Sequence, residues 1–294
     1  MRLISSAVAR LWARTRSAID HLYYANGGIG DELMLTAIAA AAREAGRPID
    51  VIASYPVLWR GNNDPASIQT GLDRWLYAER RQWVPTKITH LAYITGNGRH
   101  IAGQMAEKVG FRLAPDWRPV LKHRAVARRP RRIVVQNSCR GARYAATTKE
   151  WSQMRWLELV ARLATDFELL QIGAPADPPL AGVEDYRGRT SLLEAVDLIA
   201  SARGFVGLES GLMHVAAAVH TPAVIILGGR TRPFETCYPF NRNVGRAPAC
   251  VSCGLNDHCP HHIVCMEIPV DEVYEHVREL MREPTPALRS LSDS

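Results

Sequence analysis

Short apolar runs alternate with longer segments of mixed polarity along the first part of the chain. The apolar runs have the length of strands, and the longer segments are rich in helix-forming Ala, Leu and Met. Strands that alternate with helices predict a parallel sheet covered by helices. We therefore predict an α/β domain over residues 21–125. Its strands are predicted at 21–26, 49–53 and 88–95, and its helices at 31–45, within 65–80 and at 100–109.

A short basic stretch, H-R-A-V-A-R-R-P-R-R, follows at residues 123–132 and is typical of an interdomain linker. The alternation then restarts, which predicts a second α/β domain over residues 130–269. Two Rossmann-like domains in tandem predict parallel sheets that face a central cleft, because each sheet binds ligands at the carboxyl ends of its strands. The strands of the second domain are predicted at 133–136, 168–172, 205–207 and 223–227, and its helices at 151–164, 192–202 and 211–219.

The two ends of the chain have their own patterns. Residues 1–20 place Arg10, Arg14 and Arg16 among apolar residues, as in a basic amphipathic helix. Such a helix either contacts an anionic membrane surface or packs on its own domain, unless it is a frayed terminus. A last helix is predicted at 270–283, and the Pro- and Ser-containing residues 284–294 predict a flexible tail.

The composition of the chain limits the kinds of binding partner and the cellular compartment that we expect. The 294 residues are 47% hydrophobic, which is enough for large cores, and their net charge of +7 favours anionic partners. By charge alone these include phosphorylated sugars, nucleotides, nucleic acid and an acidic membrane surface, and the function that we expect involves no nucleic acid. No apolar run reaches the roughly 20 residues that span a bilayer, and the first residues lack the uninterrupted apolar stretch that predicts a secretory signal. The expected location is the cytoplasm, with peripheral contact at the inner membrane as an option.

The first segment with candidate chemistry is N-G-G-I-G-D, which ends at Asp31. Gly28 and Gly30 lie between a predicted strand and helix, where they let another molecule approach the backbone. Asp31 is expected at the helix N-terminus, exposed in the cleft. In the alternative interpretation the glycines only form a tight turn and Asp31 caps the helix. A dinucleotide fingerprint is disfavoured, because Leu33 occupies the position of its third glycine.

The second segment is A-A-T-T-K-E-W, which delivers Lys149 just before a helix. A lysine there can neutralise a diphosphate leaving group, and the hydroxyls of Thr147 and Thr148 can donate hydrogen bonds to its oxygens. Arg140 and Arg143 are further candidates for phosphate contact. Alternatively, Lys149 is a solvated surface charge.

The third segment is G-L-E-S-G-L-M-H-V-A-A-A, which runs from a strand end into a helix. The backbone amides of Ser210, Gly211 and Leu212 are expected to point out of the helix and to bind an anion such as a diphosphate. His214 is either a ligand residue or a hydrogen-bonded histidine of the core.

The order of these segments, followed by P-A-V-I-I-L-G from Pro222 and by a cysteine-rich loop, resembles glycosyltransferase family 9, the lipopolysaccharide heptosyltransferases and their relatives. The resemblance runs from about residue 21 to 282. It is strongest at S-G-L-M-H-V-A-A-A and G-G-R-T-R-P, whereas the first domain matches mainly at G-G-I-G-D. It implies a GT-B fold, in which the second domain holds the donor and the first the acceptor, and an inverting transfer.

The resemblance also implies roles for single residues. Asp31 falls on the proposed general base, Lys149 on the lysine that contacts the donor phosphates, and Asp177 near an acidic position that holds the donor ribose. Where this chain has Glu209, the family often has Asp. The remaining donor residues are Thr148, Ser210, Gly211, Leu212 and His214, and Gly28 and Gly30 form an acceptor or phosphate loop.

The expected function is a metal-independent transfer of a sugar, with ADP-heptose as the best donor, to a hydroxyl of a lipopolysaccharide core, another glycan or a protein. The chain lacks a D-x-D sequence, in agreement with this chemistry. One alternative is a degenerate relative that binds a nucleotide or a partner without turnover, although the presence of both Asp31 and Lys149 argues against it. The other alternative, a nicotinamide-dependent oxidoreductase, is disfavoured by Leu33 and by the second α/β domain.

Four cysteines lie close together in the sequence, with the spacing C-x2-C-x5-C-x5-C over residues 250–265, here called the cysteine loop. Four thiolates form tetrahedral sites for zinc or iron, so a structural metal is one interpretation, with no cofactor required for catalysis. The resemblance implies that a similar cysteine loop is frequent in the family and that relatives which glycosylate autotransporters carry an iron-binding version, although the spacing here is tighter. Alternatively, the thiols are reduced and packed, or oxidise on purification. The four cysteines are Cys250, Cys253, Cys259 and Cys265, and His258, His261 and His262 are substitutes for one of them.

Overall fold

The computed structural model describes residues 21–62, 64–69, 87–124, 126–143 and 145–284. The chain divides into two compact units, which are described separately. The first unit contains the described residues within 1–93 and 102–120, and the second unit contains 94–101 and those from 121 onward. The predicted basic helix at 1–20 lies outside the described residues, as does all but the first residue of the predicted tail.

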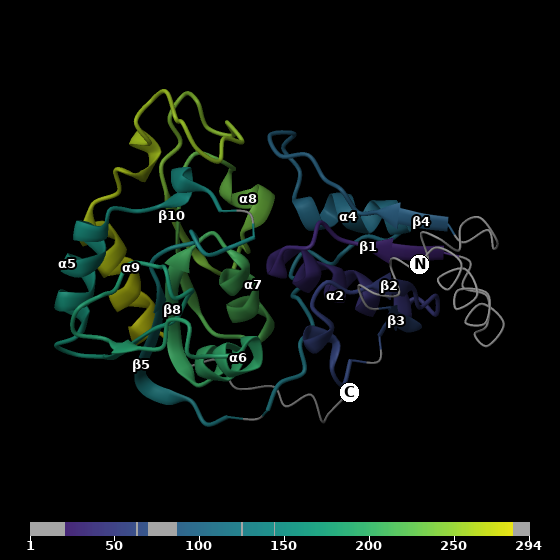
Figure 1. The fold of residues 1–294 in the computed structure, drawn as a ribbon, viewed down its shortest axis with the longest axis horizontal. Helices are drawn as coiled ribbons and strands as arrows, with labels where there is room; N and C mark the ends of the chain where they lie inside the picture. Colours follow the sequence, from purple (N-terminus) through teal and green to yellow (C-terminus); the bar gives the residue numbers. More distant parts are fainter. Residues whose placement is uncertain (1–20, 63, 70–86, 125, 144, 285–294) are drawn as a thin grey trace, which may run out of the picture. The chain divides into compact units, whose positions relative to one another are not determined.

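The first unit contains a parallel four-stranded sheet with the order β3-β2-β1-β4 (Figure 1). Its helix α2 buries Leu33, Leu35 and Ile38 completely, and the strand residue Leu22 is equally buried. The strands are β1 (His21–Tyr24), β2 (Asp50–Ile52), β3 (Ser67–Gln69) and β4 (Lys87–His90), and the helices are α2 (Ile29–Glu44), the 3-10 turn η1 (Pro56–Trp59) and α4 (Ile101–Val109).

The second unit contains a parallel six-stranded sheet with the order β10-β9-β8-β5-β6-β7. Figure 1 shows α5 and α9 on one side of this sheet and α6 and α7 on the other. The apolar side chains of β5, β8 and β9 are fully buried between them. The strands are β5 (Arg129–Gln136), β6 (Glu168–Gln171), β7 (Glu184–Asp185), β8 (Ala202–Leu208), β9 (Ala223–Leu227) and β10 (Arg242–Gly245).

All helices of the second unit except the last one connect successive strands, as in βαβ units. Two 3-10 turns carry candidate residues: η2 holds Lys149, and η3 holds Cys265. The helices are α5 (Gln153–Leu163), α6 (Leu192–Ala200), α7 (Gly211–Ala218), α8 (Pro233–Thr236) and α9 (Val270–Arg282), and the turns are η2 (Thr147–Lys149) and η3 (Val264–Met266).

Most predicted elements occur with shifted ends, but two differences have clear causes. The strand predicted at 133–136 begins at Arg129, because Arg129 already pairs with Ala202 ahead of a register shift. The predicted linker therefore ends inside a strand. The helix predicted within 65–80 is wrong at its start, since Ser67–Gln69 pairs with β2 as strand β3, and residues 70–86 lie outside the described part of the chain.

Candidate active site

The strand orders place a topological switch point in each unit. When β5 to β10 are numbered 1 to 6 along the chain, the second sheet read from β7 has the strand order 3-2-1-4-5-6. This is the order of the Rossmann fold. The chain leaves β5 toward one edge of the sheet, through β6 and β7, and returns to β8 on the other side of β5. In open α/β sheets ligands bind outside the carboxyl ends of the strands at this point. The loops that follow β5 and β8 are therefore the candidate site of the second unit.

Lys149 and Glu209, which come from these two loops, form an ion pair. The Lys149 ammonium lies 2.6 Å from Glu209 Oε2 and donates to the Glu209 backbone carbonyl at 3.2 Å. Their side chains are only 16% and 10% exposed. The structure thus brings together two predicted donor residues that are sixty positions apart in the sequence.

Ser210 marks the start of α7 beside this pair. Its hydroxyl donates to Gln136 Oε1 at 2.6 Å, and its side chain does not cap the helix. The first amides of α7, from Gly211 and Leu212, therefore receive no capping side chain, and such amides together with the helix dipole attract anions. The predicted anion site at the start of α7 directly follows Glu209, the residue that holds the Lys149 ammonium.

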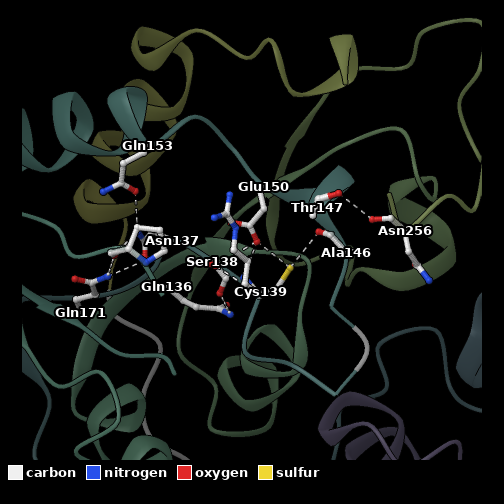
Figure 2. A network of polar contacts seen from close by, with 12 residues as sticks. Gln136, Asn137, Ser138, Cys139, Ala146, Thr147, Glu150, Gln153, Gln171 and Asn256 are labelled. Carbon is white, nitrogen blue, oxygen red and sulfur yellow. Dashed lines mark hydrogen bonds and ion pairs between the residues drawn. The ribbon is translucent and has the colours of Figure 1, made fainter. Parts of the chain in front are cut away.

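A polar network connects the end of β5 to the turn that carries Lys149 (Figure 2). Gln136 donates to the Ser138 carbonyl at 2.8 Å, and Glu150 accepts from the Cys139 amide at 2.8 Å. Arg140 lies 3.6 Å from the same carboxylate. Sequence reasoning missed Gln136 and Glu150, although a polar residue that ends an apolar strand was an available signal for Gln136.

Asp177 lies in the turn after β6 and is 4% exposed. Its Oδ2 accepts from the Ala174 amide at 2.7 Å, and its Oδ1 is buried without a hydrogen-bond partner among the described residues. Gly173 has φ +151°, and a Cβ there would lie 2.4 Å from Asp177 Oδ2, so the turn requires glycine. Buried polar oxygens are rarely left unpaired, which makes Oδ1 a candidate acceptor for a ligand hydroxyl.

His214 lies one turn into α7 and is 5% exposed. Its Nδ1 is 2.7 Å from the hydroxyl of Tyr238, which is itself buried. Burial, with a smaller contribution from the charges of His100 and Lys149, lowers the pKa of His214 to about 3. The imidazole is therefore neutral at physiological pH, and its geometry is that of a hydrogen-bonded histidine of the core.

The hydroxyls of Thr147 and Thr148 donate to backbone carbonyls of the protein, whereas the sequence predicted that they donate to a diphosphate. Thr148 Oγ1 donates to the Leu255 carbonyl at 2.6 Å, and Thr147 Oγ1 donates to the Asn256 carbonyl at 3.3 Å. Thr148 is only 3% exposed. Both hydroxyl protons are therefore used within the protein and do not point to a ligand.

The switch point of the first unit lies between β1 and β4, because its strand order is 3-2-1-4. Asp31 follows β1, and Tyr93 follows β4. The Tyr93 hydroxyl donates to Asp31 Oδ1 at 2.7 Å, and the Gly28 amide donates to Oδ2 at 3.3 Å. Helix α2 begins at Ile29 and includes Gly30, so Asp31 is its third residue, and its carboxylate accepts from the amide of the N-cap residue Gly28, in agreement with the alternative interpretation that Asp31 caps the helix. Asp31 is 7% exposed, so the expectation of an exposed carboxylate is wrong.

Glu32, beside Asp31, is fully buried and was missed by the sequence analysis. It accepts from Trp59 Nε1 at 2.6 Å and from the Ser54 amide at 3.1 Å. Burial raises the pKa of Glu32, these hydrogen bonds lower it, and the charge of Asp31 raises it. Glu32 thereby ties the start of α2 to the loop after β2 and fixes the position of Asp31.

The cysteine loop contains four free thiols that differ in exposure: Cys265 is buried and Cys253 is exposed. Burial raises the pKa of Cys265, a backbone hydrogen bond at Gly229 opposes this shift, and the charges of Cys259 and Cys250 add to it. Within the ranges that the structure describes, however, no three His, Cys, Asp or Glu side chains are close enough to hold one metal ion. The thiols as placed therefore do not fit the predicted zinc or iron site.

Comparison with known proteins supports the motif interpretation. Residues 112–255 match the model of glycosyltransferase family 9 (heptosyltransferase). The chain resembles glycosyltransferase family 9. The family 9 match includes Lys149, Asp177, Glu209 and the start of α7, and Asp31 lies outside it.

Relatives of this family include lipooligosaccharide heptosyltransferase 2 of Haemophilus influenzae, which is 37% identical over 112 residues, or 33% of this chain and 32% of the relative. The autotransporter heptosyltransferase Aah of Escherichia coli is 32% identical over 152 residues, or 45% of this chain and 38% of Aah. The aligned part thus spans about a third of the length of these curated relatives.

Two solved structures of heptosyltransferases share the fold. The iron-containing dodecameric glycosyltransferase TibC from enterotoxigenic E. coli has a TM-score of 0.70 and 20% identity, with 90% of this chain and 77% of TibC covered. ADP-heptose lps heptosyltransferase II of E. coli has a TM-score of 0.64 and 17% identity, with 89% of this chain and 98% of that protein covered. The predicted GT-B-like α/β fold with two parallel sheets is confirmed. In the described part of the chain, no helix combines the length and the apolar character needed to cross a membrane.

Proposed function

We propose that this protein is an inverting glycosyltransferase that moves a sugar from a nucleoside diphosphate sugar, with ADP-heptose as the donor, to an acceptor hydroxyl. The observation that carries the proposal is the pairing of Lys149 with Glu209 beside the uncapped start of α7, at the switch point of the second sheet. The match to the family 9 model covers these residues.

The second unit supplies the chemistry of the leaving group. As the bond between the anomeric carbon and the diphosphate oxygen breaks, negative charge grows on the diphosphate. The Lys149 ammonium and the amides of Gly211 and Leu212 offset this charge, so the proposed reaction requires no divalent cation. Asp177 Oδ1, which is buried without a partner in the described structure, accepts from a hydroxyl of the donor ribose.

The first unit supplies the base. An acceptor oxygen attacks the anomeric carbon from the side opposite the diphosphate, which inverts its configuration, and Asp31 accepts the proton of the attacking hydroxyl. Tyr93 and the Gly28 amide hold the carboxylate for this step. Gly28 and Gly30 leave room for the acceptor beside the backbone.

The proposed acceptor is a hydroxyl of a lipopolysaccharide core, another glycan or a protein. We propose that the chain acts in the cytoplasm, with peripheral contact at the inner membrane through the basic residues among 1–20 as an option. The cysteine loop binds structural zinc or iron only if binding draws the thiols together. Stoichiometric metal in the purified protein that is lost in Cys250→Ser supports this site, and less than a stoichiometric amount removes it.

The direct test combines calorimetry with product analysis. ADP is expected to bind more tightly than UDP or GDP. Mass spectrometry of reactions with a panel of nucleotide sugars and with envelope or protein acceptors is expected to detect a product of increased mass only with ADP-heptose. A degenerate nucleotide-binding protein, the alternative function, gives ADP binding without product from any donor and acceptor. NAD binding without ADP-heptose turnover would instead favour an oxidoreductase.

A further inference from the structure

The cysteine loop meets the turn that carries Lys149. Carbonyl groups of Leu255 and Asn256, within the loop, accept from the hydroxyls of Thr148 and Thr147, and the Asn256 carbonyl also accepts from the Thr148 amide at 3.3 Å. Figure 2 shows the contact between Thr147 and Asn256. Three hydrogen bonds thus join the turn η2 to a segment more than one hundred residues further along the chain.

The loop is fixed in turn to the end of β9. The Ser252 amide donates to the Gly229 carbonyl at 2.7 Å, and the Gly254 amide donates to the Arg230 carbonyl at 3.0 Å. Arg230 Nε donates to Asn256 Oδ1 at 2.9 Å. The carbonyls that receive Thr147 and Thr148 are therefore held by the sheet through the G-G-R sequence that follows β9.

Close packing reinforces these hydrogen bonds at Gly228. A Cβ on this residue would lie 2.8 Å from Met266 Sδ, 3.2 Å from Cys265 Sγ and 3.2 Å from the Thr148 carbonyl. A side chain at this position would therefore require its neighbours to shift. Gly228, Cys265 and Thr148 therefore form one packed junction between β9, the cysteine loop and the Lys149 turn.

We propose that the cysteine loop is a positioning element for the donor site, and that Thr148 is a positioning residue that holds Lys149 through Leu255 rather than a ligand of the donor. Thr148 is 3% exposed, and its proton is committed at 2.6 Å, so its hydroxyl has neither the access nor the proton for a phosphate. Lys149, the next residue, is held between this junction and Glu209. This inference concerns the same site as the proposed function. Only the identification of that site as the donor site rests on the proposed function.

The test observes Lys149 directly, without a nucleotide. The chain has only four lysines, Lys87, Lys108, Lys122 and Lys149, so lysine-selective 13C labelling gives a spectrum in which the Lys149 side-chain signal is assigned by Lys149→Met. We expect Thr148→Val to shift this signal and Thr148→Ser, which keeps the hydroxyl, to leave it near the wild-type position.

Thr221 offers a matched control. It is also 3% exposed and donates its hydroxyl proton to a backbone carbonyl, that of Ile199, at 2.8 Å. Thr221→Val loses the same chemical group in the same unit but does not contact the Lys149 turn, so it is expected to destabilise the protein without moving the Lys149 signal. An unchanged Lys149 signal in Thr148→Val, or an equal shift in Thr221→Val, overturns the positioning role.

A titration with ADP separates this inference from the proposed function. We expect Thr148→Val to weaken ADP binding about tenfold and Thr148→Ser to restore it, since one hydrogen bond typically has an effect of this size. If wild-type ADP binding is absent while the Lys149 signal still responds to Thr148→Val, the positioning role stands and the proposed function fails. Should Thr148→Val not fold, Asn256→Ala removes the brace to Arg230, and its Lys149 signal is expected to shift in the same direction by less; no shift there also contradicts the inference.

Discussion

The Lys149 ammonium lies 2.6 Å from the Glu209 carboxylate and also donates to the Glu209 backbone carbonyl, so one residue holds the lysine by two groups. The pair is mostly buried. Removal of one partner of a buried ion pair strongly destabilises a protein, because the other charge is left buried without a partner. In the proposed function a diphosphate competes with Glu209 for the Lys149 ammonium. We therefore expect Glu209 to set how strongly Lys149 binds an anion, and the Asp that is often found here in glycosyltransferase family 9 is shorter by one methylene.

Replacement of Lys149 tests the anion site. Lys149→Met removes the charge but keeps the length of the side chain, and we expect it to weaken ADP binding by tenfold or more, because charge-assisted hydrogen bonds contribute about 1.5–3 kcal/mol. Calorimetric titration with ADP measures the effect. Lys122→Met, on an exposed lysine, is the control and is expected to bind ADP like the wild type. Equal affinity in the two variants contradicts the role of Lys149.

Asp31→Asn separates chemistry from donor binding. The amide cannot accept the acceptor proton at neutral pH, so we expect transfer to fall below detection while ADP affinity stays within about twofold of the wild type. Product formation is followed by mass spectrometry and ADP binding by calorimetry. Normal turnover in this variant removes Asp31 from the mechanism.

Tyr93→Phe tests the partner of Asp31 without touching the carboxylate. Loss of the 2.7 Å hydrogen bond leaves Asp31 less well oriented, and we expect kcat to fall about tenfold with donor KM unchanged. Steady-state kinetics at varied donor concentration measure both constants. Tyr23→Phe, on a tyrosine of β1 that contacts His21 rather than Asp31, serves as the control. A change in donor KM alone would assign Tyr93 to binding instead.

The buried His214 predicts a pH dependence of stability. Its pKa is about 3 in the folded protein and near 6.5 when unfolded, so below pH 6.5 the unfolded chain binds more protons and the free energy of unfolding falls. The slope from this group approaches about 1.4 kcal/mol per pH unit between these values. Thermal unfolding from pH 7 to 4 is expected to show a smaller loss in His214→Asn than in the wild type.

His258→Asn is the control for this experiment, because the His258 side chain is 93% exposed. It is expected to leave the pH dependence unchanged. His100, whose pKa burial lowers to about 4, contributes in the same direction and explains a residual slope in His214→Asn. Parallel curves for His214→Asn and the wild type would mean that His214 is not buried as a neutral imidazole.

The sequence predicted the architecture well because the apolar strands are unambiguous. β9 and α9 occur at the predicted residues, since a continuous buried run and a clear apolar stripe define them. β7 and β10 were missed because they are short, polar edge strands, whose pairing depends on the neighbouring strand rather than on their own residues.

The candidate site was predicted by motif but not by geometry. The sequence named Lys149 and Glu209 separately, and their contact required the adjacency of β5 and β8, which no local pattern contains. Tyr93 and Glu32 were missed for the same reason, because each reaches its partner across the fold. The sequence predicted that the Thr148 hydroxyl binds a phosphate. Its partner in the structure is the Leu255 carbonyl in the cysteine loop, which no local pattern around Thr148 indicates.

Both sheets place their candidate residues beyond the carboxyl edge of the strands, while the apolar side chains below that edge are closed off from solvent. The candidate residues for ligand binding therefore lie mostly outside the apolar cores that stabilise the two units. We expect new specificities to arise by exchange of exposed residues in the loops that follow the strands, while the packed loop positions Gly173, Gly228 and Thr148 and the strands beneath keep their sequence.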